Sequence, residues 1–231
     1  EYTTDGGTTW TPVANTTITQ SYSNIVDPTG YRAVVTNGCG NSNSSIAWIA
    51  IRNYWTGIVN SDWHNANNWA DNLVPSTLCA DVHIRGGKPH QPTIFTGSAS
   101  IQNIHIYPGA ILTVDDATLR ISGTINNSGT FIANDQHAII ELNGSAAQSI
   151  PANTFQNNAL GNLKINNSSV QGVTIDGPLD VYYSVTFSGT GRKLNTGGFL
   201  TFKSTAQETA WLGDVTGNTI VGDATVERDR K

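Results

Sequence analysis

The 231-residue sequence has no methionine, few charges and only two cysteines. Charged residues make up 13% of the chain, well below the usual quarter, and a net charge of −5 gives no basic footprint for nucleic acid. No apolar run is long enough to cross a bilayer, so we expect no membrane insertion. No secretory signal opens the chain. Because the initiator methionine is also missing, we expect a piece of a longer protein. The missing signal peptide therefore says nothing about the compartment.

Two cysteines cannot establish an oxidising compartment. Cys39 and Cys79 are candidates for one disulfide, and the alternative is that Cys39 pairs with a cysteine upstream of residue 1. Spacing alone cannot test the geometry that a bridge requires, so this pairing is a hypothesis.

Threonine, serine, asparagine and glycine are abundant, which favours β-structure with many tight turns. From about residue 80 an apolar–polar–apolar motif followed by small polar residues recurs. Its copies "LRISGT", "IELNGS", "LKINNS" and "VTFSGT" begin at Leu119, Ile140, Leu163 and Val185. Two earlier copies, "VHIRGG" from Val82 and "IHIYPG" from Ile104, also lie 22 residues apart. This period predicts a parallel β-solenoid, or β-helix, over residues 80–231. The alternative is an antiparallel sandwich or barrel, which also has evenly spaced strands.

Asparagine pairs recur at 126–127, 157–158 and 166–167. They suggest stacked amide ladders at the corners of the coils.

Residues 1–52 predict short strands of a partial β-sandwich. "DGGTTW" has the composition of a hairpin turn, "YRAVVTNGCG" alternates into a second turn, and "SIAWIAI" predicts a final apolar strand. Four or five strands fall short of a complete immunoglobulin-like set.

A resemblance covers these first fifty residues. "TTDGGTTWTPVANTT" followed by "YRAVVTNGCG" resembles the second half of the immunoglobulin-like modules in large surface proteins of gliding and biofilm-forming Bacteroidetes. The resemblance implies a secreted or cell-surface location, with further modules of the same long chain as partners.

Residues 53–79 form a polar connector that carries three of the six tryptophans, Trp55, Trp63 and Trp69. Together with Val74 and Pro75 they resemble the segment that precedes predicted β-helical repeats in the same surface proteins. Aromatic side chains bury much area with few rotatable bonds, so we interpret the three as a plug over the first coil. The alternative is that they stack on sugar rings.

Chemistry-bearing side chains are few. His83 and His105 occupy equivalent positions one repeat apart, so their imidazoles would stack or share a metal, but no third ligand is evident at that register. A stacked pair without function is the favoured interpretation. Asp115 and Asp116 are the best candidates for Ca²⁺, and the favoured alternative is that they are structural turn residues. We otherwise expect no cofactor.

Outward-facing aromatics provide the remaining candidate site. Tyr182 and Tyr183 should point to opposite faces of a strand, and with Trp211 they are candidates for a carbohydrate-binding platform. Scattered exposed aromatics without function are the alternative.

An enzyme is not predicted, because the paired carboxylates of a glycosidase and the motifs of other hydrolases are missing. Arg120, Glu141 and Lys164 share one position of the repeat, which favours a surface charge ladder over a catalytic remnant.

The sequence therefore predicts a non-catalytic fragment of a large extracellular surface protein, acting as a rigid spacer or adhesion module. The alternative is a carbohydrate-binding or, with less support, a polysaccharide-processing β-helix, with surface glycans as partners.

Overall fold

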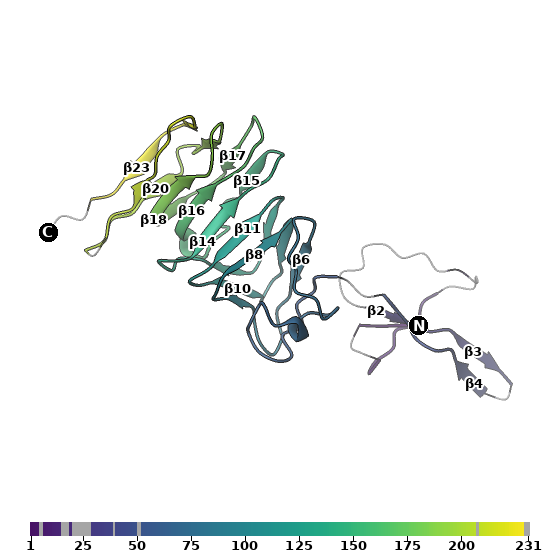
Figure 1. Cartoon of the computed structure of the whole chain (residues 1–231). Helices are drawn as coiled ribbons and strands as arrows, with labels where there is room; N and C mark the ends of the chain where they lie inside the picture. Colours follow the sequence, from purple (N-terminus) through teal and green to yellow (C-terminus); the bar gives the residue numbers. More distant parts are fainter. Residues whose placement is uncertain are drawn as a thin grey trace.

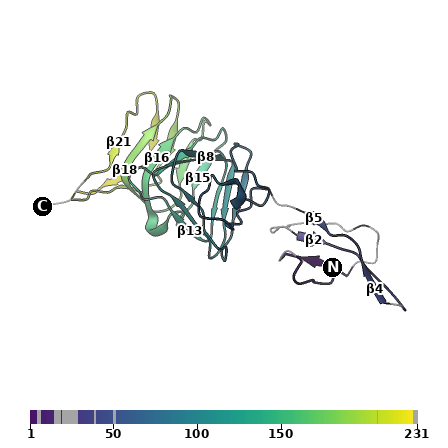
Figure 2. The ribbon, with the colours of Figure 1, turned by 60° about the horizontal axis from the view of Figure 1, so that its bottom comes forward.

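The computed structural model describes residues 1–4, 7–14, 19, 29–38, 40–49, 52–206 and 208–228. These residues form an all-β structure with two single-turn 3-10 helices, η1 (Ala66–Asn68) and η2 (Gln156–Asn158). Small antiparallel sheets occupy the first part of the chain, and a parallel solenoid follows (Figure 1). Figure 2 shows that the strands before residue 50 lie apart from the stacked coils.

The N-terminal part pairs only locally. Its first sheet joins three antiparallel strands: β1 (Tyr2–Thr3), β2 (Thr29–Tyr31) and β5 (Ala47–Ile49). A hairpin joins β3 (Val34–Asn37) to β4 (Gly40–Asn43), where "YRAVVTNGCG" predicted a turn. The turn predicted at "DGGTTW" falls partly on Asp5 and Gly6, which lie outside the described residues.

The described residues of this part show antiparallel pairing and contribute nothing to the hydrophobic core cluster. Val35 and Trp48 are exposed, and the hydrophobic core cluster of the described residues begins at Trp55. The described strands therefore do not close into a sandwich.

The first three coils each contribute one strand to each of three faces. The coils are β6 (Asp81–Ile84), β7 (Thr93–Ile94) and β8 (Ser98–Ile101); β9 (Asn103–Ile106), β10 (Ile111–Val114) and β11 (Thr118–Ile121); and β12 (Ile125–Asn127), β13 (Thr130–Ile132) and β14 (Ile139–Leu142). Strands of neighbouring coils pair in parallel, so the hydrogen bonds run along the stack.

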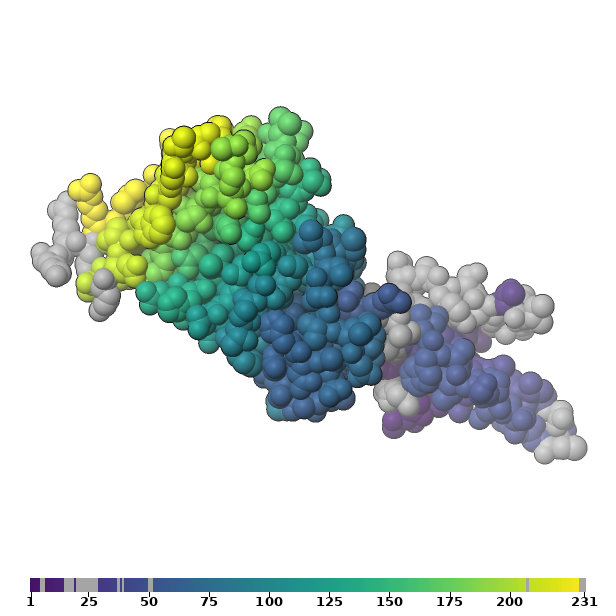
Figure 3. Space-filling view, in the orientation of Figure 1, coloured from purple at the N-terminus to yellow at the C-terminus, as the bar shows by residue number. Residues whose placement is uncertain are grey.

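In the next two coils one bent strand spans the second and third faces, and in the coil after those the two faces have separate strands again. The strands are β15 (Gln148–Ile150) and β16 (Ala159–Ile165); β17 (Val173–Ile175) and β18 (Leu179–Phe187); β19 (Lys193–Asn195), β20 (Leu200–Phe202) and β21 (Trp211–Leu212); and β22 (Thr219–Val221) and β23 (Ala224–Val226). β18 pairs with β20 through its first half and with β21 through its second half. The solenoid has about seven turns of roughly 22 residues, and Figure 3 shows the turns stacked in chain order.

Four of the six copies of the repeat lie on the third face, and the two earlier copies, from Val82 and Ile104, lie on the first face. Leu119 pairs with Ile140, Ile140 with Leu163, and Leu163 with Val185. Because every one of these pairings is parallel, the antiparallel alternative is wrong for residues 81–226. The paired aliphatic side chains point inward and are buried, which gives one continuous core.

An incomplete coil closes the N-terminal end of this core. Tyr54 forms a parallel bridge to His83 on the first face, and Asp62 forms one to Thr93 on the second. Trp55, Trp63 and Trp69 are buried in the core cluster, so none of them offers a face to a sugar ring. The Trp69 ring meets the other two edge-on, with centroids 5.1 and 4.7 Å away.

Asn68 holds this closing coil together, and its role was not evident from the sequence. The side chain is fully buried. Its Oδ1 accepts from the amides of Val59 and Asn60, at 3.0 and 3.1 Å. Its Nδ2 donates to Asn60 Oδ1 and to the carbonyl of Asp62, at 2.7 and 2.9 Å.

The predicted asparagine ladder is wrong. Residues 126–127 lie in β12, 157–158 in the turn before β16, and 166–167 in the loop after it, so the pairs occupy different corners. Their amides bond to other groups of neighbouring turns instead of to one another. Asn167, for example, donates to the Ala146 carbonyl at 2.7 Å.

Candidate functional site

The first face of the solenoid carries two imidazoles in register. β6 and β9 pair so that His83 lies beside His105. The flanking aliphatic residues point into the core and turn both imidazoles outward. The ring centroids are 4.7 Å apart and the planes differ by 8°, so the predicted stack is confirmed.

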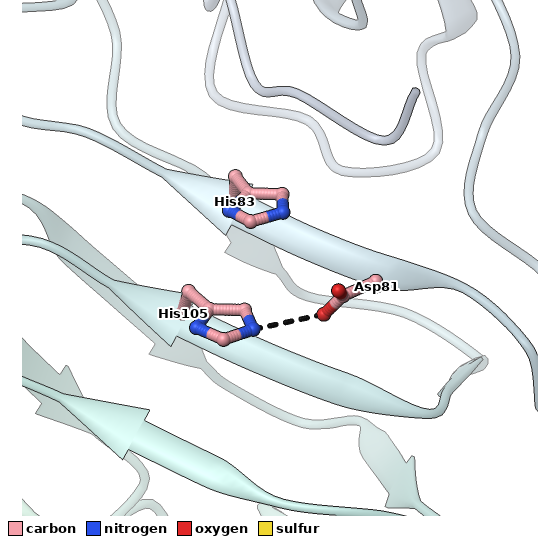
Figure 4. Close-up of side chains that lie close together, drawn as sticks. All are labelled: Asp81, His83 and His105. Carbon is pink, nitrogen blue, oxygen red and sulfur yellow. Dashed lines mark hydrogen bonds and ion pairs between the residues drawn. The ribbon is translucent and has the colours of Figure 1, made fainter. Parts of the chain in front are cut away.

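A carboxylate joins this pair. Asp81 begins β6 and faces the same side as His83, two residues further along. His105 Nε2 lies 2.9 Å from Asp81 Oδ1. One ligand atom from each of the three side chains lies within 4.8 Å of the others. Figure 4 shows Asp81 at the same edge of both rings.

Asp81 is not evident from the repeat, because it does not occupy the position equivalent to the two histidines. The next place in the histidine row is Asn126, which pairs with His105. Asp81 belongs to a different row, and it reaches His105 along the diagonal between neighbouring strands. Long side chains bridge such diagonals, so residues two places before each histidine were the signal to look for.

Tyr107 fixes the opposite edge of the cluster. Its hydroxyl lies 3.1 Å from His83 Nδ1, and its ring stacks against both imidazoles. The Arg85 guanidinium lies 4.2 Å from the centroid of the Tyr107 ring. The positive charge of Arg85 therefore follows the C-terminal end of β6, whereas Asp81 stands at its N-terminal end.

Solutes can reach the cluster from solvent. The Asp81 side chain is 52% exposed and the His105 side chain 28% exposed. Two imidazole nitrogens and one carboxylate suit a divalent transition metal, whereas Ca²⁺ prefers a shell of oxygens. Within the described part of the chain, this is the one group of three such side chains that could hold an ion.

A second candidate site is an open pocket of about 460 Å³ on the second face. It contains two of the predicted site residues, Asp115 and Tyr183. The other residues that line it are Thr113, Val114, Ile132, Asn134, Asp135 and Gln136.

The neighbouring carboxylates of this pocket have separate partners. Asp116 Oδ1 lies 3.4 Å from His137 Nδ1. Asp135 Oδ1 accepts hydrogen bonds from the amides of His137 and Asp116, at 2.7 and 3.3 Å. The bond from the His137 amide is the main cause that lowers the pKa of Asp135. The structure therefore gives Asp116 and Asp135 local structural contacts, and Ca²⁺ at Asp115–Asp116 stays a prediction.

A bulge interrupts the strand at the two adjacent tyrosines, where alternation was expected. Val181 pairs with Leu160 and Ser184 with Asn162, so Tyr182 and Tyr183 together face a single residue across a bulge. Both side chains are half-buried at this corner. Trp211, in β21, is exposed beside Ser184. Neither Tyr182 nor Trp211 lines the pocket, so only Tyr183 belongs to it.

A family model described as a domain of unknown function (DUF8693) matches residues 54–189. The chain belongs to the DUF8693 family. No curated protein and no solved structure matches it. The match begins in the closing coil, at Tyr54, and ends just after β18. The histidine cluster and the Tyr183 pocket therefore both lie within the DUF8693 match, and Trp211 lies outside it.

The predicted charge ladder is confirmed as a row of ion pairs on the third face of this DUF8693 chain, but its acidic member, Glu141, is buried and not at the surface. Arg120 Nε and Lys164 Nζ lie 3.2 and 3.5 Å from Glu141 Oε2. Asn166 Nδ2 donates to Glu141 Oε1 at 2.7 Å. The Glu141 side chain is buried beneath these partners, and both of its carboxylate oxygens have a partner that belongs to the fold.

Two further properties concern the chain as a whole. Cys79 is an exposed free cysteine, while Cys39 lies outside the described residues, so their pairing stays a prediction. In the part of the chain that the structure describes, no helix has the length and apolar character to span a membrane.

Proposed function

We propose that this DUF8693 chain is a non-catalytic, rigid spacer or adhesion module of a large extracellular surface protein. The observation that carries the proposal is the parallel pairing that links coil to coil from β6 to β23. Each coil is hydrogen-bonded to the next along the stack, so bending the body would break many bonds at once. Such a body keeps the modules at its two ends at a fixed distance.

Neighbouring modules of the same long chain are the proposed partners. We interpret the antiparallel strands before residue 50 as the latter part of an immunoglobulin-like module. This interpretation follows from the resemblance of the sequence to the Bacteroidetes surface proteins. The tryptophan-filled closing coil supports this arrangement, because it seals the solenoid core where another module would join.

Two replacements in the full-length protein of the producing organism test the spacer role. In one, residues 54–228 are exchanged for a flexible Gly/Ser linker, and in the other for an unrelated β-solenoid of similar length. Antibody access on intact cells measures display. We expect the unrelated solenoid to preserve display of the distal modules and the linker to reduce it. If the distal modules are displayed equally well with the linker, the spacer role is contradicted. If antibodies do not reach the wild-type protein on intact cells, the cell-surface location is contradicted.

The pocket at Tyr183 supports carbohydrate binding as a second candidate function. An aromatic ring beside carboxylates and side-chain amides is the combination that packs against a sugar ring and bonds to its hydroxyls. Asn134, Gln136 and Asp115 provide those polar groups around Tyr183.

A polysaccharide array, with and without Ca²⁺, distinguishes the two functions. If the pocket binds glycan, Tyr183→Ala abolishes the signal, whereas the matched variants Tyr182→Ala and Trp211→Ala retain it. A signal that survives Tyr183→Ala would exclude this pocket. Absence of any signal would leave the spacer role as the function to pursue.

A further inference from the structure

We propose that Asp81, His83 and His105 bind one divalent transition-metal ion of the zinc–copper class, which links the first two full coils. This proposal is independent of the spacer role. The ligands would be His83 Nε2, His105 Nε2 and a carboxylate oxygen of Asp81. Water would complete the shell on the exposed side, as in three-ligand zinc sites.

The side chains are already close to a ligating arrangement. A Zn–N bond is near 2.1 Å, which brings two ligating nitrogens to about 3.4 Å from each other. The parallel imidazoles, with centroids 4.7 Å apart, reach this separation if they tilt toward one another. Rotation of an imidazole about its Cβ–Cγ bond has a broad energy minimum, so the tilt costs little. Asp81 already lies at the shared edge of the two rings (Figure 4).

Tyr107 is the second observation that points to a metal. Ligating histidines usually hydrogen-bond through the nitrogen that does not bind the ion, which fixes the ring and its tautomer. The Tyr107 hydroxyl stands at His83 Nδ1 in this way. When Nδ1 donates to that hydroxyl, Nε2 carries the lone pair of the ring and can bind an ion. Tyr107 is thus a positioning residue for the ligand set.

The ion would act between coils. Asp81 and His83 belong to β6, and His105 belongs to β9, so a shared ion cross-links neighbouring turns next to the closing coil. A ligand that binds only the folded chain raises its thermal stability. Zinc should therefore raise the unfolding temperature in a way that depends on all three side chains.

Titration of the tag-free 231-residue protein with ZnCl₂ tests the proposal, with calorimetry as the measurement. We expect one saturable site. His105→Ala and the near-isosteric Asp81→Asn should each raise Kd by about tenfold or more, and Tyr107→Phe by about tenfold. His64 and His137 provide matched controls, because each lies near a carboxylate without a second imidazole in that pair. His64→Ala and His137→Ala should leave Kd unchanged.

Thermal unfolding with ZnCl₂, CaCl₂ or MgCl₂ provides the second measurement. Zinc should raise the unfolding temperature of the wild type and of both control variants, and at the same zinc concentration should raise that of Asp81→Asn by clearly less. Circular dichroism establishes that each variant is folded. If His105→Ala does not fold, the test rests on Asp81→Asn. The Asp81 side chain is exposed and asparagine has nearly the same shape, so this variant should fold. A wild-type Kd above about 1 mM, equal loss in the control variants, or a comparable response to CaCl₂ would overturn the proposal.

Discussion

Single buried polar side chains determine local stability at the N-terminal end of the solenoid. Asn68 satisfies two backbone amides and one carbonyl of a loop that has no regular strand pairing of its own. Such a residue resists substitution, because each partner left unbonded in a buried position is costly.

We therefore predict that Asn68→Ala lowers the free energy of unfolding by roughly 2–4 kcal/mol, since several hydrogen bonds are lost together. Denaturant unfolding measures the change. Asn67→Ala, at the exposed neighbouring position, is the control and should be close to neutral. Equal effects of the two substitutions would show that Asn68 does not hold the loop.

Asp135 gives a residue-scale prediction about pH. Hydrogen bonds from backbone amides lower the pKa of Asp135 in the folded state below the unfolded pKa of 3.8. The ionised carboxylate therefore stabilises the fold at pH values above 3.8. This stabilisation is lost as the pH falls through the lower pKa of the folded state. At pH 7, Asp135→Asn should cost about 0.5–1 kcal/mol, a modest value because the side chain is partly exposed. The cost should shrink once the pH is below 3.8. Chemical unfolding at several pH values measures it, and a cost that grows in acid would contradict the assignment.

At the scale of the strands, the charge ladder on β11, β14 and β16 joins three coils. Glu141 is the shared partner, and it is buried while Arg120 and Lys164 stay more exposed. Truncation of the shared partner should therefore cost more than truncation of either cation.

Glu141→Gln should lower the free energy of unfolding by about 1–2 kcal/mol, because the charge-assisted bonds from Arg120 and Lys164 are weakened. A double-mutant cycle with Lys164→Ala measures the coupling. Additive effects would mean that the 3.5 Å contact between Lys164 and Glu141 contributes nothing to stability.

At the scale of the whole molecule, the solenoid is a stack in which each coil pairs only with its nearest neighbours. In such a stack the ends open before the centre, and damage at one end spreads only to adjoining coils. Strands β22 and β23 are largely exposed, whereas β16 and β18 lie between paired neighbours on both sides.

Trp69→Ala should accordingly accelerate amide hydrogen exchange in β6 and β7 while leaving β16 and β18 close to wild type. The lost aromatic packing is worth about 3–5 kcal/mol, and the stack confines that loss to the capped end. Mass spectrometry of exchanged peptides measures the pattern. Trp211→Ala, which removes an exposed tryptophan, is the matched control. Uniform acceleration along the chain would indicate a single cooperative unit.

The repeat made much of the solenoid predictable from sequence. Leu119, Ile140, Leu163 and Val185 could be aligned because each coil must place an aliphatic residue at the same point of the core, and the pairings follow that alignment. That alignment also arranged the three charges of the ladder, and a separate alignment of Val82 with Ile104 placed His83 beside His105.

Only the tertiary structure decided the contacts between residues that occupy different positions of the repeat. Asp81 meets His105 along a diagonal, and Tyr183, beside the bulge of β18, lines the same pocket as Asp115. Sequence spacing determines which residues share a row, since strand alternation and coil length are local properties. It does not determine which rows converge, because that depends on how far each corner bends and on where long side chains reach across neighbouring strands.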